Sequence, residues 1–338
     1  MKKFACLFLA LILVWLGFPA QPTHAASPGF GVENLRAAAQ IDPDASFFQL
    51  LASPNQTGNI KVKISNYTNG THRYKVAINR ATTNANGEID YTQHGKKVPA
   101  KSQANIETLF TKPKTVSIAP RSVQTVTMAY KTPAKPISGI ILGGVSVTCL
   151  DPETNASAGL SSEVAYVTAV QLQATKAIPH FTPDLMMPSA TAQSTSGGVE
   201  VIANLTNPLP VIQSKMTITA KLVKDGKHKA TLKRTVKAAR LAPNSHMPMA
   251  LNLTPKDIKA GDYHVIVDAH LPNNQSHWHF SKPLHISQAV IKTTEAKAET
   301  HHLRNLPAWL IILLIAIIAS LALLAIWLKM RLNEDKRA

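Results

Sequence analysis

Four side chains that end in oxygen atoms lie within seven residues of one another: Asn84, Asn86, Glu88 and Asp90. Carboxylate and amide oxygens are the ligands that a hard cation such as Ca²⁺ prefers, so this spacing is compatible with a cation site. The same residue types around a glycine are also typical of a hairpin turn, in which asparagine side chains bond their own backbone. A third interpretation is contact with a sugar, since loops on a rigid sheet often carry binding residues. We take these four residues and Tyr91 as candidate ligand-binding residues and assign no metal.

Four histidines lie close together between residues 264 and 279: His264, His270, His277 and His279. His277 and His279 are two residues apart, so on a strand their side chains share one face. Two imidazoles on one face can begin a metal site. Because no carboxylate or cysteine lies at a supporting spacing, we interpret these histidines as solvated and predict no cofactor.

Residue types used in catalysis are present without the spacing that catalysis needs. A glycosidase requires two carboxylates with separated pKa values, and the sequence singles out no pair among Asp42, Asp44, Glu88, Asp90 and Glu107. The chain has no Gly-x-Ser-x-Gly elbow, His-Glu-x-x-His helix or glycine-rich phosphate loop. Cys149 has no neighbouring base and is interpreted as an inert thiol. We therefore predict a protein that is not an enzyme, with a cell-wall glycan hydrolase as the less favoured alternative.

Three tyrosines could stack on sugar rings: Tyr67, Tyr74 and Tyr91. Tyrosines at strand positions are also common in half-buried cores, because the ring is apolar and the hydroxyl polar. The sequence leaves both interpretations open, with the core favoured.

The elements that position these residues are predicted to be strands. In residues 59–65, Ile60, Val62 and Ile64 alternate with polar residues, as in a strand with one buried face. Gly143 and Gly144 lie in an apolar run and suggest a bulge or a close backbone approach. Similar segments follow in two sets: 73–79, 123–130, 139–148 and 163–173, then 198–206, 215–223, 229–236, 247–253, 262–269 and 277–286.

Many short strands separated by turn signals predict an all-β protein with two tandem Ig-like β-sandwich domains. Residues 259–263, which end in Tyr263, resemble the tyrosine corner of such sandwiches. We place the first domain at 27–160, the second at 161–290 and a flexible tether at 291–306. No clear internal repeat is seen.

Both ends of the chain predict export and anchoring. Residues 1–26 have the charged, apolar and small-residue regions of a secretory signal peptide. Residues 307–328 form the predicted transmembrane helix; the run from 308 carries no charge over 21 positions, which spans roughly 30 Å as a helix. Trp309 and Trp327 flank the run, and Lys329 and Arg331 begin the basic tail 329–338. The positive-inside rule places that tail in the cytoplasm and the domains outside, so we predict a single-pass cell-membrane protein.

The formal net charge of the chain is +17. The signal and the tail each carry a net two positive charges, which leaves +13 on the part between them. A positive field favours acidic partners. The single cysteine beyond the signal favours bacterial export, because exported animal proteins usually contain more cysteine. Outside a bacterial cell the acidic partners are wall polymers and anionic lipid headgroups. Nucleic acid is not expected, because no basic helix or motif of interleaved aromatic and basic residues accompanies the charge.

Several segments resemble the WxL-interacting proteins of Gram-positive bacteria. The fairly specific one is ATTNANGEIDY at 81–91, supported by IAPRS at 118–122, GIILGGV at 139–145, LAPNS at 241–245 and KAGDYH at 259–264. The order of signal, two β domains, one helix and basic tail also fits. Residues 32–43 depart from the start that is usual in the family.

The resemblance implies that the first domain binds peptidoglycan and that the second binds a host or extracellular ligand, with WxL-type surface proteins as partners. The alternative is an assembly scaffold that binds only proteins at the cell surface.

Overall fold

The computed structural model describes residues 29–95, 104–151, 164–254, 259–272, 276–293, 313 and 315–318. The predicted signal peptide 1–26 and the anchor residues Trp309, Trp327, Lys329 and Arg331 lie outside these ranges. Of the predicted membrane segment 307–328, only residues 313 and 315–318 are described, and they are helical. Among the described residues, no helix has the length and apolar character needed to cross a membrane.

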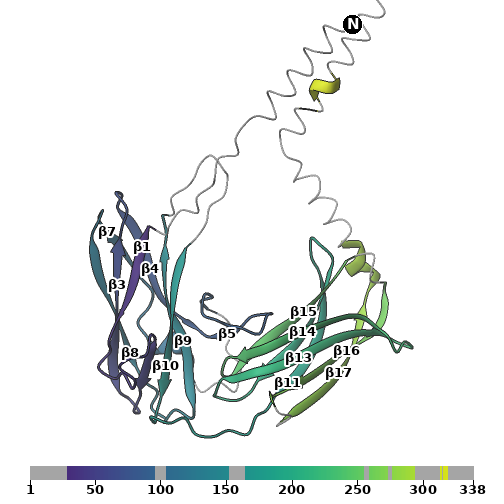
Figure 1. Ribbon diagram of the computed structural model, residues 1–338, viewed down its shortest axis with the longest axis horizontal. Coiled ribbons are helices and arrows are strands. Elements are labelled where there is room, and N and C mark those ends of the chain that lie inside the picture. Colours follow the sequence, from purple (N-terminus) through teal and green to yellow (C-terminus); the bar gives the residue numbers. More distant parts are fainter. Residues whose placement is uncertain are drawn as a thin grey trace, which may run out of the picture.

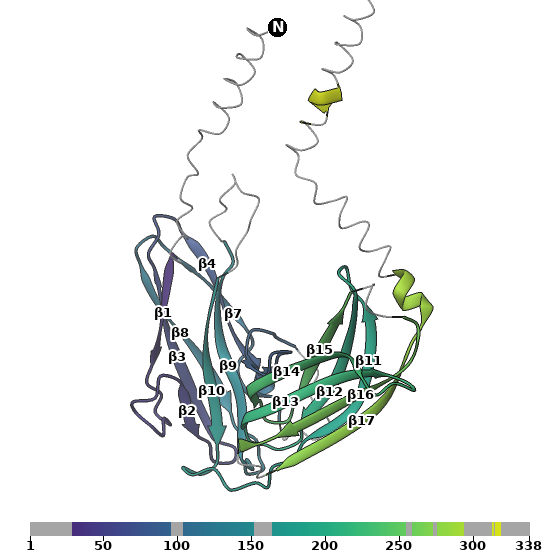
Figure 2. The ribbon, with the colours of Figure 1, turned by 45° about the vertical axis from the view of Figure 1, so that its right-hand side comes forward.

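The described chain folds into two β-sandwiches that lie side by side, so the all-β prediction is confirmed (Figures 1 and 2). In the first, a three-stranded sheet of order β1-β3-β8 packs on a five-stranded sheet of order β2-β10-β9-β4-β7. Its strands are β1 (Phe30–Leu35), β2 (Phe48–Leu51), β3 (Thr57–Asn66), β4 (His72–Arg80), β7 (Lys114–Ile118), β8 (Val123–Lys131), β9 (Ile140–Cys149) and β10 (Ala165–Gln173). A short helix, α2 (Ile106–Leu109), lies on β4 and β9.

The second sandwich pairs a three-stranded sheet of order β11-β12-β15 with a four-stranded sheet of order β14-β13-β16-β17. Its strands are β11 (Met186–Ser194), β12 (Val199–Asn207), β13 (Gln213–Lys224), β14 (Ala230–Leu241), β15 (Ser245–Leu253), β16 (Gly261–His270) and β17 (His277–Ile286). The Tyr263 hydroxyl donates to the Lys259 carbonyl oxygen at 2.7 Å, which forms the expected tyrosine corner.

The two sandwiches repeat one topology, a feature that was not seen in the sequence. Strands β1, β3 and β8 correspond in chain order and sheet position to β11, β12 and β15. The order β10-β9-β4-β7 likewise corresponds to β17-β16-β13-β14, and the first sandwich adds β2 beside β10. The chain therefore contains the same fold twice, with a small extension of one sheet.

Alternation of apolar side chains builds both cores, as the sequence indicated. Ile60, Val62 and Ile64 of β3 are fully buried, while the residues between them lie on the outer face. Gly143 and Gly144 of β9 interrupt no pairing, so they form no bulge. A Cβ atom on Gly143 would lie 2.5 Å from the Asn79 carbonyl oxygen, which makes this the close backbone approach.

Two boundaries differ from those predicted. The division at residue 160 falls before β10, which pairs with both β9 and β2 and so belongs to the first sandwich. The first sandwich therefore extends to Gln173. The predicted tether begins at 291, but residues 288–293 are helical and Ile291 is only 6% exposed within the second core. Burial of this side chain holds the start of the segment against the sandwich.

Candidate functional site

The segment that carries the family-like motif forms a small hairpin between the sandwiches, with strands β5 (Thr82–Thr83) and β6 (Ile89–Asp90). The Asn84 side-chain oxygen accepts hydrogen bonds from the backbone N–H groups of Asn86, at 2.9 Å, and Glu88, at 3.0 Å. Gly87 has a φ of +73°, which glycine adopts without a steric penalty. The Asp90 carboxylate accepts from the backbone and hydroxyl of Thr92. The oxygens of Asn84 and Asp90 therefore bond within the loop, while Asn86 and Glu88 keep exposed side chains.

The tip of this hairpin rests on β14 of the second sandwich. The Gly87 carbonyl oxygen accepts from the Arg240 N–H at 2.7 Å. The Arg234 guanidinium donates to the Ala85 carbonyl oxygen at 3.0 Å and to the Asn86 side-chain oxygen at 2.7 Å. A Cβ atom on Gly87 would lie 2.7 Å from the Ala239 Cβ. Glycine is therefore required at this position both by the turn and by the contact with β14.

The base of the hairpin contacts the turn between β14 and β15. The Thr83 hydroxyl oxygen accepts from the Ala242 N–H at 2.9 Å and lies 2.8 Å from the Ser245 hydroxyl. The Arg80 guanidinium donates to the Asn244 carbonyl oxygen at 2.5 Å. A small apolar cluster closes the contact; it contains Ala81, Ile140, Leu142 and Ala242, with Ile89, Tyr91 and Ile212 against it. We call this contact the junction: residues 80–91 and 139–142 of the first sandwich against 210–212 and 234–245 of the second.

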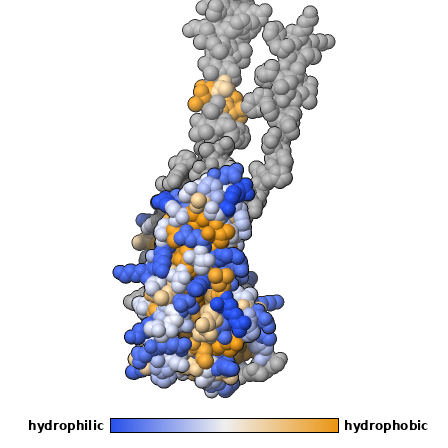
Figure 3. Space-filling model, turned by 90° about the vertical axis from the view of Figure 1, so that its left-hand side faces the viewer, coloured by the Kyte–Doolittle hydropathy of each residue, from blue (hydrophilic) through white to orange (hydrophobic). Residues whose placement is uncertain are grey.

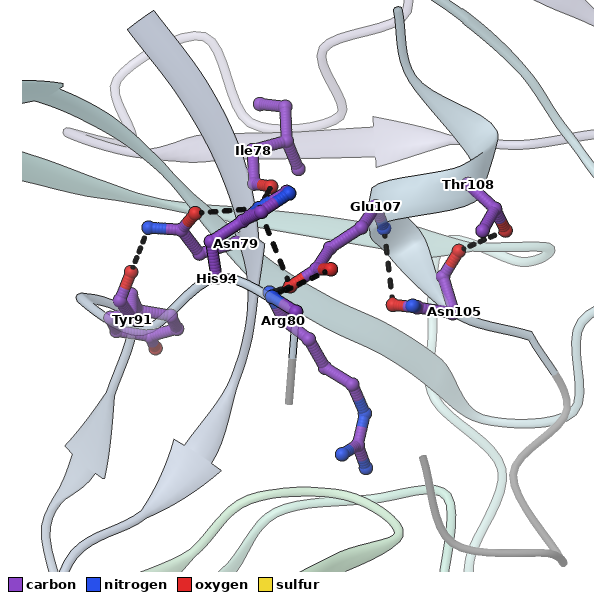
Figure 4. A network of polar contacts seen from close by, with 9 residues as sticks. Ile78, Asn79, Arg80, Tyr91, His94, Asn105, Glu107 and Thr108 are labelled. Carbon is purple, nitrogen blue, oxygen red and sulfur yellow. Dashed lines mark hydrogen bonds and ion pairs between the residues drawn. The ribbon is translucent and has the colours of Figure 1, made fainter. Parts of the chain in front are cut away.

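A polar network holds the hairpin from behind (Figure 4). The Glu107 carboxylate accepts from the backbone N–H of Arg80 at 3.0 Å and from that of Gly95 at 3.1 Å. The Asn79 side chain donates to the Tyr91 carbonyl oxygen at 2.7 Å. Arg80 is only 6% exposed, and burial lowers the pKa of its guanidinium. The Arg80 guanidinium is stabilised by its hydrogen bond to the Asn244 carbonyl oxygen and by the negative charge of Glu107. Through the bond to Asn244, this buried guanidinium links the two sandwiches.

Tyr91 packs at the base of the same hairpin. A Cβ atom on Gly144 would lie 2.7 Å from the Tyr91 Cβ, which explains the second glycine of the pair in β9. Burial raises the pKa of the Tyr91 hydroxyl. Tyr74 lies in the first core at 1% exposure, and burial raises its pKa to about 12. Of the three tyrosines that could stack on sugars, only Tyr67 is exposed, at 56%.

Tyr67 forms one wall of a groove of about 340 Å³ on the first sandwich. The groove runs between β1 and β10 and is lined by Phe30, Gly31, Val32, Glu33, Ser65, Tyr67 and Tyr166. A Cβ atom on Gly31 would lie 2.6 Å from the Tyr67 hydroxyl oxygen, so glycine lets the ring lie against β1. The rings of Phe30 and Tyr166 meet edge to face, with centroids 5.0 Å apart. Because Phe30 is only 3% exposed, the aromatic surface of the groove comes from Tyr67 and Tyr166, beside the polar side chains of Glu33 and Ser65.

Exposed apolar and charged side chains lie together on the three-stranded sheet of the first sandwich. Seen from the side of the first sandwich, apolar patches lie among polar ones (Figure 3). Glu33 forms an ion pair with Lys63 on this sandwich. Val123 of β8 is exposed as well, and its Cα pairs with that of Ser65. No local pattern in the sequence indicates the groove, because its lining comes from three separate segments: residues 30–33, residues 65–67 and Tyr166.

Comparison with known proteins identifies both parts of the chain. Residues 30–149 match the family model described as WxL Interacting Protein, peptidoglycan binding domain, and residues 155–296 match that of WxL Interacting Protein, host binding domain. The two matches divide the chain between residues 149 and 155, whereas strand pairing places β10 in the first sandwich. No curated protein matches the chain.

Solved structures similar to the chain include the CupB2 chaperone of Pseudomonas aeruginosa, with 12% identity over 67% of this chain and 92% of that chain and a TM-score of 0.26. The class 5 fimbriae chaperone CfaA has 9% identity over 71% of this chain and 97% of that chain, with a TM-score of 0.26. A PapD-like domain of human CEP192 has 10% identity over 47% of this chain and 98% of that chain, with a TM-score of 0.27. Because these TM-scores are low, the conclusion rests on the two family matches, which occur in the predicted order. The chain belongs to the WxL-interacting protein family.

Proposed function

We propose that this protein is a non-enzymatic receptor of the cell surface whose first sandwich binds peptidoglycan in the Tyr67 groove. The observation that carries the proposal is the exposed ring of Tyr67 in a groove that Tyr166 and the polar side chains of Ser65 and Glu33 also line. Binding sites commonly join an apolar surface to a few polar groups that fix orientation. The apolar face of a sugar ring can pack on Tyr67, while its hydroxyls bond to Ser65 and Glu33.

The second sandwich would bind a WxL-type surface protein or a host ligand, in line with the family's host-binding domain. We infer that the junction fixes the orientation of the second sandwich relative to the groove of the first. The buried Arg80 and the close contact at Gly87 join the two sandwiches there. The hairpin residues Asn84, Asn86, Glu88, Asp90 and Tyr91 serve this junction in the proposal. With the two binding surfaces held together, a modest affinity at each is sufficient.

The membrane segment 307–328 would hold the protein at its own cell, with the domains outside and the tail 329–338 in the cytoplasm. Support comes from the uncharged sequence and its flanking tryptophans and basic residues. Separating membranes from wall and medium tests this part. The full chain should remain with the membranes, and a chain ending at 306 should leave them; equal distribution of both would contradict the anchor.

Co-sedimentation of the full-length protein with purified, protein-free peptidoglycan tests the proposed binding. The measurement is made in low salt and at about 0.5 M salt, where the Debye length falls to a few ångströms and exposed charge attraction is screened. We expect capture to persist in high salt, to fall at least fivefold in Tyr67→Ala and to be retained in Tyr67→Phe, which keeps the ring. Met186→Ala removes an exposed side chain of the second sandwich and is the matched control. Capture only in low salt, unchanged by Tyr67→Ala, would overturn the groove and favour the protein-only scaffold.

A further inference from the structure

The outer face of the four-stranded sheet in the second sandwich gathers histidines from two neighbouring strands. His270 of β16 is paired directly with His277 of β17, and Asp268 is paired with His279 in the next outward-facing row. The residues between them, Ala269 and Trp278, point toward the core side. Three imidazoles and one carboxylate therefore occupy two adjacent rows of one face.

The pairing brings the side chains of these rows close together. The Leu271 N–H bonds to the Ser276 carbonyl oxygen at 3.0 Å, so these two residues form a hydrogen-bonded pair. Because such pairs alternate along an antiparallel ladder, His270 and His277 form a non-hydrogen-bonded pair, the kind with the closer side chains. Their Cβ atoms are then about 4.5–5.5 Å apart, and His279 is a same-face neighbour within reach of a long side chain.

His279 is already oriented as a metal-binding histidine would be. Its Nδ1 lies 2.7 Å from a carboxylate oxygen of Asp268, whose other oxygen is 3.0 Å from the Lys221 ammonium. A proton held on Nδ1 leaves the Nε2 lone pair directed away from the carboxylate. Carboxylates that orient metal-binding histidines act in this way.

We propose that His270, His277 and His279 bind one divalent transition-metal ion of the zinc type on the outer face of β16 and β17. Three imidazoles with an open fourth position are a ligand set that Zn²⁺ accepts, at about 2.0–2.1 Å from each nitrogen. Asp268 is a positioning residue, since both of its oxygens are engaged by other groups. No three histidine, cysteine, aspartate or glutamate side chains of the described residues converge on a point. Binding therefore requires the imidazoles of His270 and His277 to turn about their side-chain bonds. Within the described residues, no hydrogen bond or ion pair holds either ring in place.

A matched control lies on the same strand. His285 is exposed and pairs through Nδ1 with Asp262 at 2.7 Å, in the same manner as His279 with Asp268. Asp262 faces it directly across the ladder, and the nearest histidine, His264, is a diagonal neighbour that is already paired with Asp225 and Ser281. Substitution of His285 removes a carboxylate-paired imidazole without touching the proposed site.

Zinc titration by calorimetry of the full-length protein, purified in detergent without a histidine tag, tests the proposal. We expect one Zn²⁺ per chain, a loss of affinity of at least tenfold in His277→Ala and in His279→Ala, and a change of less than twofold in His285→Ala. Asp268→Asn should weaken binding by about tenfold, the lower end of the range for a lost orienting partner. An unfolding midpoint measured without zinc should be the same for the three histidine variants, because the substituted side chains lie on the surface. Absence of zinc binding, or an equal loss in His277→Ala and His285→Ala, would overturn the proposal.

Discussion

The two sandwiches contain the same corner in opposite surroundings. Asn66 ends β3, and its side-chain N–H groups donate to the carbonyl oxygens of Gly70, Ile118 and Ala119. Asn207 ends β12, and its side chain donates to those of Val211, Leu241 and Ala242 in the same arrangement. Each asparagine thus joins the turn that follows its strand to the turn that leads into the third strand of the sheet.

The surroundings of these two turns differ. Residues 119–121 of the first corner are exposed, whereas residues 241–245 of the second are buried beneath the hairpin of the first sandwich. One corner of a repeated fold is thus used to hold the two sandwiches together. The corner of the first sandwich remains open to solvent. It lies beside Tyr67, which follows Asn66 and lines the proposed peptidoglycan groove. The same local structure can therefore be a structural joint in one domain and part of a binding face in the other.

The largest expected effect comes from removing each corner asparagine. In Asn207→Ala the buried carbonyls lose their donor without access to water, and we expect the free energy of unfolding to fall by about 3–4 kcal/mol. In Asn66→Ala water can reach the exposed turn, so the expected loss is about 2 kcal/mol or less. Urea denaturation of both variants measures the difference. Equal losses would show that the burial of the second corner has no energetic consequence.

Gly87→Ala tests the contact of the hairpin tip with β14. An alanine there must adopt a left-handed backbone and would also press on Ala239, so we expect a loss of about 2–3 kcal/mol. Gly226 has nearly the same φ, +72°, with no atom near the position of a Cβ. Gly226→Ala therefore has only the backbone cost, about 1–2 kcal/mol.

The difference between these two glycine variants in thermal or chemical denaturation isolates the contact at the junction. If both variants lose the same stability, the hairpin tip does not rest on β14 in solution.

Arg80→Met tests whether the junction couples the sandwiches. The substitution keeps most of the side-chain volume and leaves the Asn244 carbonyl oxygen without its charged donor, a loss of about 1.5–3 kcal/mol. We expect the sandwiches to move independently, which small-angle X-ray scattering would detect as a larger radius of gyration. Arg121→Met, in the exposed corner, is the control and should leave the scattering unchanged. A rigid shape in Arg80→Met would assign the coupling to the apolar cluster instead.

The smallest effect is expected at one turn position that the two corners share. Arg121 and Asn244 occupy it with φ values of 52° and 47°. Asparagine tolerates this left-handed conformation better than arginine does. Relief of the backbone strain in Arg121→Asn should therefore raise the free energy of unfolding by about 0.5–1 kcal/mol. The substitution also removes the exposed hydrogen bond from Arg121 to Asn69, which offsets part of this gain. A lower melting temperature would show that the Asn69 contact outweighs the backbone strain.

The strands that the sequence predicted have a clear apolar alternation or a long apolar run, and they include the edge strands β8, β14, β15 and β17. The missed strands β1, β2 and β7 are only six, four and five residues long, so each contains too little alternation to be recognised. In β11, Pro188 and small polar residues obscure the pattern. Edge strands are commonly short or interrupted in this way.

The candidate site was predicted less completely than the fold. The turn chemistry around Asn84 and Gly87 could be predicted, because it depends on neighbouring residues. The partners of the hairpin, Arg234 and Ser245, lie about 150 residues later, and no local pattern indicates that contact. Tyr67 and Tyr74 are the same residue type near adjacent strand ends, and only tertiary packing decides which is exposed. The repeat could have been suspected from IAPRS at 118–122 and LAPNS at 241–245, which form equivalent turns.

Hydrogen exchange of the full-length protein, with and without soluble peptidoglycan fragments, tests the comparison of the two corners most directly. In the free protein, the buried amides of Ala242, Asn244 and Ser245 should exchange slowly, and that of the exposed Ala119 should exchange fast. Added fragments should slow exchange at 65–69 and 29–33, around the open corner and the Tyr67 groove, and leave 242–245 unchanged. Protection that appears only in the second sandwich, or fast exchange at 242–245 in the free protein, would contradict the account.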